Sequence, residues 1–476
     1  GEEERGPEES TRSPFGVDDA ASVASADDED ASEDDASSSS ERAARSSASP
    51  EPERRLVFVP DAAPFAAAVS AFATRPVLDR RAAVSRVAAH ALTMHLGAAA
   101  HVRATARYLL GGAGDFTSAL VEAVARAANA AAAKAARDAR RGLGVSGPGS
   151  GSGIAARALR DALASAIRES SAASDPLASR LAIDVAASPP GSGGVFIHGE
   201  DSVLMTDVVD AAYRTEWPTS LLFATRAREA LADARRATLR LRHVVLALDD
   251  AHRSVLDAGG DRDRPRAPRD DPVRALARRR CRKLALLSAE FRHFARALER
   301  FVVDAHESAT GTLVARLAAE GNSAASGNSA ASNNRSMNRG DADANAAAAG
   351  VRDVYELRDL TSAYCHGARE ACLLSPRDAG ARESVDRACQ LALDFRVVVA
   401  KRRTTSALAT DAAAYAAAQA THAKFRVCVQ GLCERLRDEA ANRGGRRAER
   451  AAKLLAAVDF NGFYSGNATP SVRRDE

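Results

Sequence analysis

The sequence predicts an all-α fold of stacked helical bundles with long helices, a disordered N-terminal tail and loop insertions. Alanine carries much of an apolar fraction of 46%, while aromatic residues make up only 4% of the 476 residues. Because alanine has the highest helix propensity and little bulk, this composition favours long helices that pack closely. Apolar positions also recur every three or four residues, which is typical of one face of a helix.

Three long helices follow from this spacing. The first is predicted to begin at Pro218, a favourable first-turn residue, and to run to Val255. The second begins at Pro272 and continues past Phe301, and the third spans roughly Thr410 to Ala440. Shorter helices are expected over residues 77–110, 115–141, 154–170, 176–187, 351–374 and 380–400. The only strand-like runs are 195–198 and 203–209, which we expect to form a small hairpin or an extended connector.

Four segments interrupt the helical pattern. Residues 1–54 are acidic and rich in Ser, and we predict that they are disordered because they cannot bury enough apolar area to offset chain entropy. Residues 142–153, 258–271 and 320–350 have the Gly, Ser, Pro, Asn or charged composition of flexible insertions. The predicted organisation is therefore a tail over 1–54, a middle helical bundle over 55–190 and a C-terminal helical domain over 195–476.

The charge balance and the cysteines exclude several classes of protein. The 66 Lys and Arg residues nearly cancel the 63 Asp and Glu residues, which excludes a strongly basic nucleic-acid coat. No apolar run of about 18 residues is free of charge, so no membrane insertion is expected, and no signal peptide is recognised. The six cysteines form no CxxC pair, which favours a reduced cytosolic compartment. The chain begins with Gly1 rather than Met, so we expect it to be part of a longer product.

No catalytic, cofactor-binding or metal-binding site is predicted. The run Gly142–Gly147 matches G-x-G-x-x-G, but a dinucleotide fingerprint must follow a strand and open a helix, and this run follows an Arg-rich helix. His90 and His95 are part of a scattered set of histidines without zinc-ligand spacing. Cys365 and Cys372 share a helical face and are interpreted as buried small apolar residues. No nucleophile motif such as G-x-S-x-G occurs, so we expect no enzyme, no cofactor and no metal.

The densest basic run is Arg278–Arg280 with Arg282 and Lys283, on the second long helix. One interpretation is a solvated helix face, and the other is a surface for an acidic partner. Nucleic acid is the less favoured partner, because no aromatic residues lie between the charges as stacking platforms.

Five segments of the sequence, read in order, resemble those of one family of helical proteins. Residues 101–116 resemble one family segment, with matches at Arg107, Tyr108, Leu109, Leu110, Gly114, Asp115 and Phe116. The other four segments are Tyr213–Pro218, Cys281–Leu317, Glu370–Leu374 and Val458–Ser465. From about residue 56 to 465, their order and spacing resemble those of the gamma-tubulin complex components, although Phe301, Thr219 and His252 depart from the family pattern.

The resemblance implies an all-α scaffold whose C-terminal part binds gamma-tubulin and whose N-terminal part contacts sister subunits. A ring of such subunits presents gamma-tubulins in the spacing of a microtubule end and so templates nucleation. The expected partners are gamma-tubulin and other gamma-tubulin complex components, with no nucleic acid and no membrane insertion. The expected locations are the cytoplasm, the cytoskeleton and a microtubule-organising centre or spindle pole. Residues 55–190 would end the lateral-contact region, and 195–476 would form the gamma-tubulin-binding domain.

Two groups of residues are singled out. Asp459, Phe460, Asn461, Phe463 and Tyr464 are expected to bind the partner, and the alternative that these aromatics cap the C-terminal bundle stays open. Trp217, the only Trp, precedes Pro218, and this pair is expected to be a structural anchor in which the indole packs on a neighbouring helix. We also expect residues 195–465 to suffice for gamma-tubulin binding.

Two other classes of protein remain open. A helical-rod subunit of a vesicle-tethering complex would also have long Ala- and Leu-rich helices, but it would not be expected to carry Trp217-Pro218 and Asp459–Asn461 in these places. An enzyme with an unrecognised helical active site is the least favoured, because no convergent polar motif is visible.

Overall fold

A computed structural model describes residues 69–141, 156–185, 209–259, 272–323, 351–400, 411–442 and 444–465. All of these residues lie in one unit, Ala67–Glu476. The predicted tail over 1–54, the Gly-rich run 142–147 and the strand-like runs 195–198 and 203–208 lie outside the described residues. So do nearly all of the predicted insertions, of which only residues 258–259 and 320–323 are described, as the ends of two helices.

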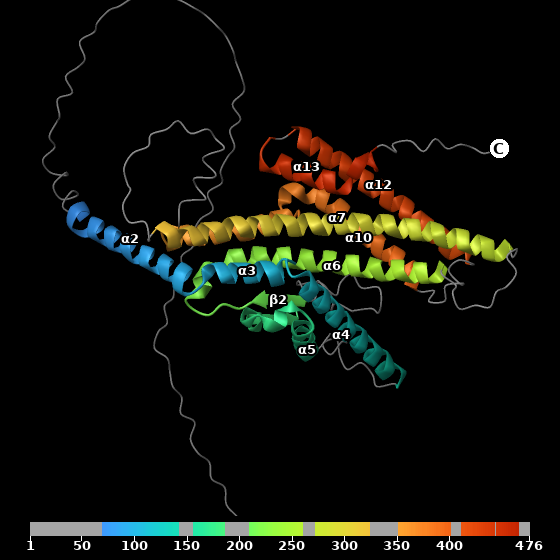
Figure 1. Cartoon of the computed structure of the whole chain (residues 1–476), viewed down its shortest axis with the longest axis horizontal. Helices are drawn as coiled ribbons and strands as arrows, with labels where there is room; N and C mark the ends of the chain where they lie inside the picture. Colours follow the sequence, from blue (N-terminus) through green and yellow to red (C-terminus); the bar gives the residue numbers. More distant parts are fainter. Residues whose placement is uncertain are drawn as a thin grey trace, which may run out of the picture. The chain divides into compact units, whose positions relative to one another are not determined.

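The fold is all-α, as predicted, apart from one small sheet (Figure 1). The main helices are α2 (Arg75–His90), α3 (Ala98–Leu109), α4 (Gly114–Arg140), α5 (Ala156–Arg168), α6 (Thr225–Gly259), α7 (Pro272–Ser323), α9 (Val354–Ala371), α10 (Ala379–Ala400), α12 (Ala412–Asn442) and α13 (Arg446–Val458). Short π-helical or 3₁₀ turns connect them: η1 (Ser70–Thr74), η2 (Ala91–His95), η3 (Ser171–Ser174), η4 (Pro176–Arg180), η7 (Thr219–Leu222), η8 (Pro376–Asp378) and η9 (Phe460–Gly462).

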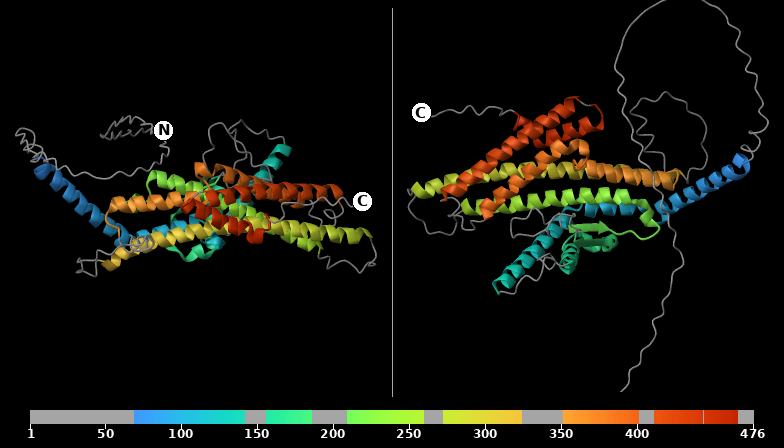
Figure 2. Two further views of the ribbon diagram at one scale, coloured as in Figure 1. Left: turned by 90° about the horizontal axis from the view of Figure 1, so that it is seen from above. Right: turned by 180° about the vertical axis from the view of Figure 1, so that it is seen from behind.

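The long helices α6 and α7 form the centre of the molecule and lie side by side in every view (Figure 2). Helix α6 also packs on α9 and α10, while α12 packs on α10 and α13, and α13 packs back on α7. The start of α7 at Pro272 confirms the prediction. The predicted start of the first long helix at Pro218 is wrong, because Phe223 adopts an extended conformation after η7 and the helix begins only at Thr225.

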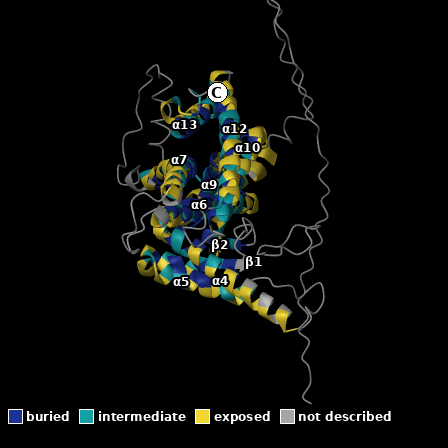
Figure 3. Ribbon diagram, turned by 90° about the vertical axis from the view of Figure 1, so that its right-hand side faces the viewer, coloured by how far each residue is buried: buried dark blue, intermediate teal, exposed yellow. Residues whose placement is uncertain are grey.

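An aromatic cluster lies at the centre of the main core. The ring of Phe291 on α7 lies 4.8 Å from that of Phe395 on α10 and 4.3 Å from that of Phe425 on α12, measured between centroids. All three side chains are fully buried. Most of the remaining core is Leu, Val and Ala, as the composition suggests, and Figure 3 shows these buried faces turned toward one another. This cluster fills the place where α7, α10 and α12 meet with three aromatic rings.

A second core lies between α4, α5 and a two-stranded antiparallel sheet. The strands are β1 (Leu181–Val185) and β2 (Val209–Tyr213). The helix predicted over 176–187 is therefore wrong: Asp175 caps only the short turn η4, and the following residues pair with β2. This strand pairing joins residues far apart in sequence, and such tertiary contacts override local propensity.

The single helix predicted over 77–110 is also wrong, because Gly97 interrupts it with a φ of 66°. This left-handed conformation favours glycine, and the carbonyl of Gly97 then accepts the N–H of Ala100 to begin α3. Helix α3 contributes Val102 and Leu109 to the main core and Tyr108 to the second core. It therefore links the two cores, so a fragment over 195–465 would lack part of both.

Candidate protein-binding surface

The C-terminal segment after α13 forms a braced turn. The carboxylate of Asp459 accepts the backbone N–H of Tyr464 at 2.7 Å, the hydroxyl of Ser465 and a guanidinium N–H of Arg437 at 3.3 Å. Asn461 and Gly462 both have positive φ angles, 58° and 67°. Asn and Gly tolerate this left-handed region best, so the sequence Asp-Phe-Asn-Gly-Phe-Tyr specifies the turn.

The five residues predicted to bind a partner divide into two groups. Asp459 and Tyr464 are buried, and Tyr464 is among the largest fully buried side chains. Phe460 and Phe463 are 64% and 46% exposed, and Asn461 between them is exposed as well. The ring of Phe463 lies under the Arg426 guanidinium, with 5.2 Å from Cζ to the ring centroid. The segment thus caps the bundle with one aromatic residue and presents two others to solvent.

The prediction that Trp217 packs on a neighbouring helix is wrong, because its side chain is 80% exposed. The hydroxyl of Thr219 and the N–H of Ser220 both donate to the carbonyl of Glu216, which turns the chain at Pro218. This turn directs Leu222 and the residue after it into the core instead. Pro218 therefore precedes a 3₁₀ turn, and its neighbour Trp217 is a surface residue rather than an anchor.

A groove of about 1390 Å³ lies between α7, α9 and α13. Seven of its lining residues are Arg or Lys and only two are Asp or Glu. Its floor is largely alanine, together with the buried rings of Phe301 and Tyr364. Sequence reasoning missed this groove because its walls come from segments about 150 residues apart. One feature of the sequence did indicate a basic surface here, because Arg292, Arg296 and Arg300 are spaced four residues apart on one helix.

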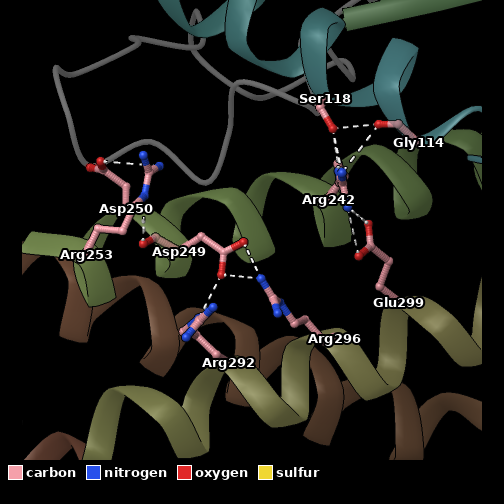
Figure 4. A network of polar contacts seen from close by, with 9 residues as sticks. All are labelled: Gly114, Ser118, Arg242, Asp249, Asp250, Arg253, Arg292, Arg296 and Glu299. Atoms are coloured by element: carbon pink, nitrogen blue, oxygen red, sulfur yellow. Dashed lines mark hydrogen bonds and ion pairs between the residues drawn. The ribbon is translucent and has the colours of Figure 1, made fainter. Parts of the chain in front are cut away.

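Ion pairs to α6 hold part of the basic wall in place (Figure 4). Asp249 on α6 accepts Arg292 Nε at 2.7 Å and Arg296 at 2.8 Å. One turn further along α7, Glu299 accepts Arg242 of α6 at 3.2 Å, and Arg242 also donates to Ser118 of α4. The two arginines held by Asp249 line the groove, and their pairing fixes where α7 presents its positive charge.

The buried titratable groups are structural. His306 lies between two backbone carbonyls, those of Leu110 at 3.2 Å and Ala368 at 3.1 Å, and burial lowers its pKa. Burial raises the pKa of Cys372, whose Sγ lies 3.8 Å from His306 Nε2, to about 12, so the thiol stays protonated and unreactive. All six cysteines are free. Within the described ranges, no group of three or more His, Cys, Asp or Glu is placed to hold a metal ion.

The segment 101–116, which was singled out in the sequence, also makes contacts that stabilise the fold. Tyr108 donates to Asp175 at 2.5 Å, Arg107 donates to the same carboxylate at 3.1 Å, and Asp115 accepts the N–H of Ser171 at 2.7 Å. These contacts fix the loop that leads into β1. The described helices include none long and apolar enough to cross a lipid bilayer.

These features define the chain as an all-α protein with exposed aromatic residues on a braced C-terminal turn and a groove lined mainly by basic and small apolar residues. Residues 99–464 match the family described as gamma tubulin complex component C-terminal. The chain belongs to this family, as the order of its sequence segments predicted. No curated protein matches the chain.

Proposed function

We propose that the chain is a non-enzymatic scaffold subunit that binds gamma-tubulin and helps to template microtubule nucleation at microtubule-organising centres. The observation that supports this proposal most strongly is the family match, which extends from α3 to Tyr464 and so includes the braced C-terminal turn. Other gamma-tubulin complex components would be further partners, and the cytoplasm, the cytoskeleton and the spindle pole would be the locations. The long helices α6 and α7 pack along each other, and such a rigid pair suits a subunit that must hold its partner in a fixed position.

Phe460 and Phe463 are the residues of the turn best placed to contact gamma-tubulin. Both are large, apolar and substantially exposed, and the turn that carries them is fixed by the buried Asp459. Aromatic residues on a rigid support are typical anchors of protein interfaces, since they bury much area at little entropic cost. Truncating the chain after Ala457 would remove these two exposed aromatics, but it would also remove the buried Val458 and Tyr464. Point variants are therefore the cleaner test of the contact.

The experiment is retention of gamma-tubulin by the immobilised full chain, with thermal melting of each variant alongside. The double variant Phe460→Ser and Phe463→Ser should remain folded, with a small decrease in melting temperature because the Phe463 ring also contacts Tyr464. It should retain gamma-tubulin at least about tenfold more weakly, as expected for two interface anchors. Leu256→Ser on α6, which is 51% exposed and far from the turn in sequence, is the matched control. If the folded wild-type chain retains no gamma-tubulin, the proposed function fails.

A further inference from the structure

The basic wall of the groove continues a stripe that begins in the dense Arg run of α7. Arg278 and Arg282 are four residues apart, and Arg278 is 14 residues before Arg292, which is close to four helical turns. Arg296 and Arg300 follow at further steps of four, so these arginines share one face of α7. The run that sequence analysis singled out is therefore the beginning of an extended basic surface.

The opposite wall, on α13, is also basic. Arg446 and Lys453 are exposed there and make no ion pair within the described part of the chain. On α7, Arg300 is 84% exposed and has only a 3.8 Å contact with Asp304 one turn away, a geometry that contributes little in water. Positive charges on two facing walls repel one another, so an anionic occupant would be stabilised between them.

The floor of the groove determines which kind of anion fits. Ala297, Ala305 and Ala309 lie half-buried along it, and the two aromatic side chains that line it are buried. Bases of a nucleic acid would find no exposed aromatic ring to stack on. A helix with small apolar residues on one side and carboxylates at its edges would fit both the floor and the walls. The α13 wall spans residues 446–457, which corresponds to about three helical turns.

We propose that the groove between α7 and α13 binds an acidic helical segment of a partner protein. The apolar side of that segment lies on the alanine floor, and its carboxylates contact Arg300, Arg446 and Lys453. This inference goes beyond the proposed function, since its test requires no tubulin and its failure would leave that function unaffected.

The test uses fluorescence anisotropy with the full chain and a labelled Ala-based peptide of about 20 residues, long enough to be helical, carrying Glu at a spacing of four. The same peptide with Gln in place of Glu is the neutral control. The Glu peptide should bind, and it should bind more weakly as salt rises from about 50 to 300 mM because the contacts are exposed. The Gln peptide should bind at least about tenfold more weakly.

Reversing the charge of the groove residues tests where the peptide binds. The triple variant Arg300→Glu, Arg446→Glu and Lys453→Glu should weaken binding of the Glu peptide about tenfold or more without changing the melting temperature, because these side chains are exposed. Reversal of Arg103, Arg157 and Arg226, which are exposed outside the groove, makes the same change in net charge and should leave binding nearly unchanged. Equal binding of the two peptides, insensitivity to the groove reversal, or tighter binding of a single-stranded oligonucleotide would each overturn the proposal.

Discussion

Asp459 accepts a hydrogen bond from the backbone N–H of Tyr464, with 2.7 Å between Oδ1 and N, and this contact closes the turn that follows α13. The same carboxylate is almost completely buried and also pairs with Arg437. A buried carboxylate with several donors organises the backbone around it, since each donor would otherwise lose its partner on leaving water. The exposed Phe460 and Phe463 depend on this buried contact for their positions.

Asp459→Ala should lower the free energy of unfolding by about 2 kcal/mol, because the buried N–H of Tyr464 loses its acceptor. Asp459→Asn should have a smaller effect, since an amide oxygen can still accept this hydrogen bond. Urea denaturation followed by circular dichroism measures both. Glu434→Ala, at an exposed position of α12, is the control and should be close to neutral. An alanine variant as stable as the wild-type chain would show that the carboxylate does not organise the turn.

Trp217→Ala should change stability by less than about 1 kcal/mol, because surface substitutions away from packed contacts have small effects. Phe223→Ala, six residues later, should cost about 3–5 kcal/mol, since that side chain is 4% exposed and belongs to the main core. Equilibrium denaturation of the two variants under the same conditions tests the contrast. A large loss for Trp217→Ala would mean that the indole is packed after all.

The comparison of these two aromatics illustrates what the sequence could predict. Helical periodicity identified α6, α7 and α12 because their apolar faces are set by local spacing. The rule that a lone Trp is buried failed because the turn before η7, and not residue type, decides which side chains face the core. Likewise β1 escaped prediction, because its partner β2 begins 24 residues after β1 ends and pairing depends on that partner.

The candidate surfaces were predictable in part for the same reason. The segment 459–465 could be recognised because all of its turn-forming residues are contiguous. The groove could not be predicted, because Arg300 and Lys453 line the same groove only after α12 has folded back and placed α13 against α7. The burial of Tyr464 beside the exposure of Phe463 depends in the same way on which neighbours the bundle supplies.

Arg242→Ala should destabilise the chain by about 2 kcal/mol, because Arg242 joins three helices (Figure 4). Its guanidinium donates to Glu299 of α7 at 3.2 Å and to Ser118 of α4 at 3.0 Å, and both contacts are partly shielded from water. Arg253→Ala on the same helix is the matched control, since its contact with Asp250 is 3.9 Å long and well exposed. Thermal melts should separate the two variants, and equal melting temperatures would contradict the bridging role of Arg242.

As the pH falls, the fold should begin to lose stability while the carboxylates are still ionised. We expect this because of His243 on α6. Burial, assisted by the positive charge of Arg396, lowers the pKa of His243 from 6.5 to about 4. Between about pH 6.5 and 4, His243 is protonated in the unfolded chain and neutral in the folded chain. The free energy of unfolding therefore decreases as the pH falls. The effect is complete near pH 4 and amounts to at most about 3 kcal/mol. Asp249 changes stability in the same direction but at lower pH, since its arginine partners hold its pKa below 3.8 and its stabilising contribution is lost only as the pH falls below about that value.

His243→Gln should therefore reduce the loss of stability between about pH 6.5 and 4 while leaving the curve below that range unchanged. Part of the loss should remain, because burial also lowers the pKa of His306. Urea midpoints measured across this pH range for the wild-type chain and for His243→Gln provide the comparison, with the exposed His366→Gln as the control. If both variants follow the wild-type curve, His243 is solvated in the folded chain and its burial does not control the acid response.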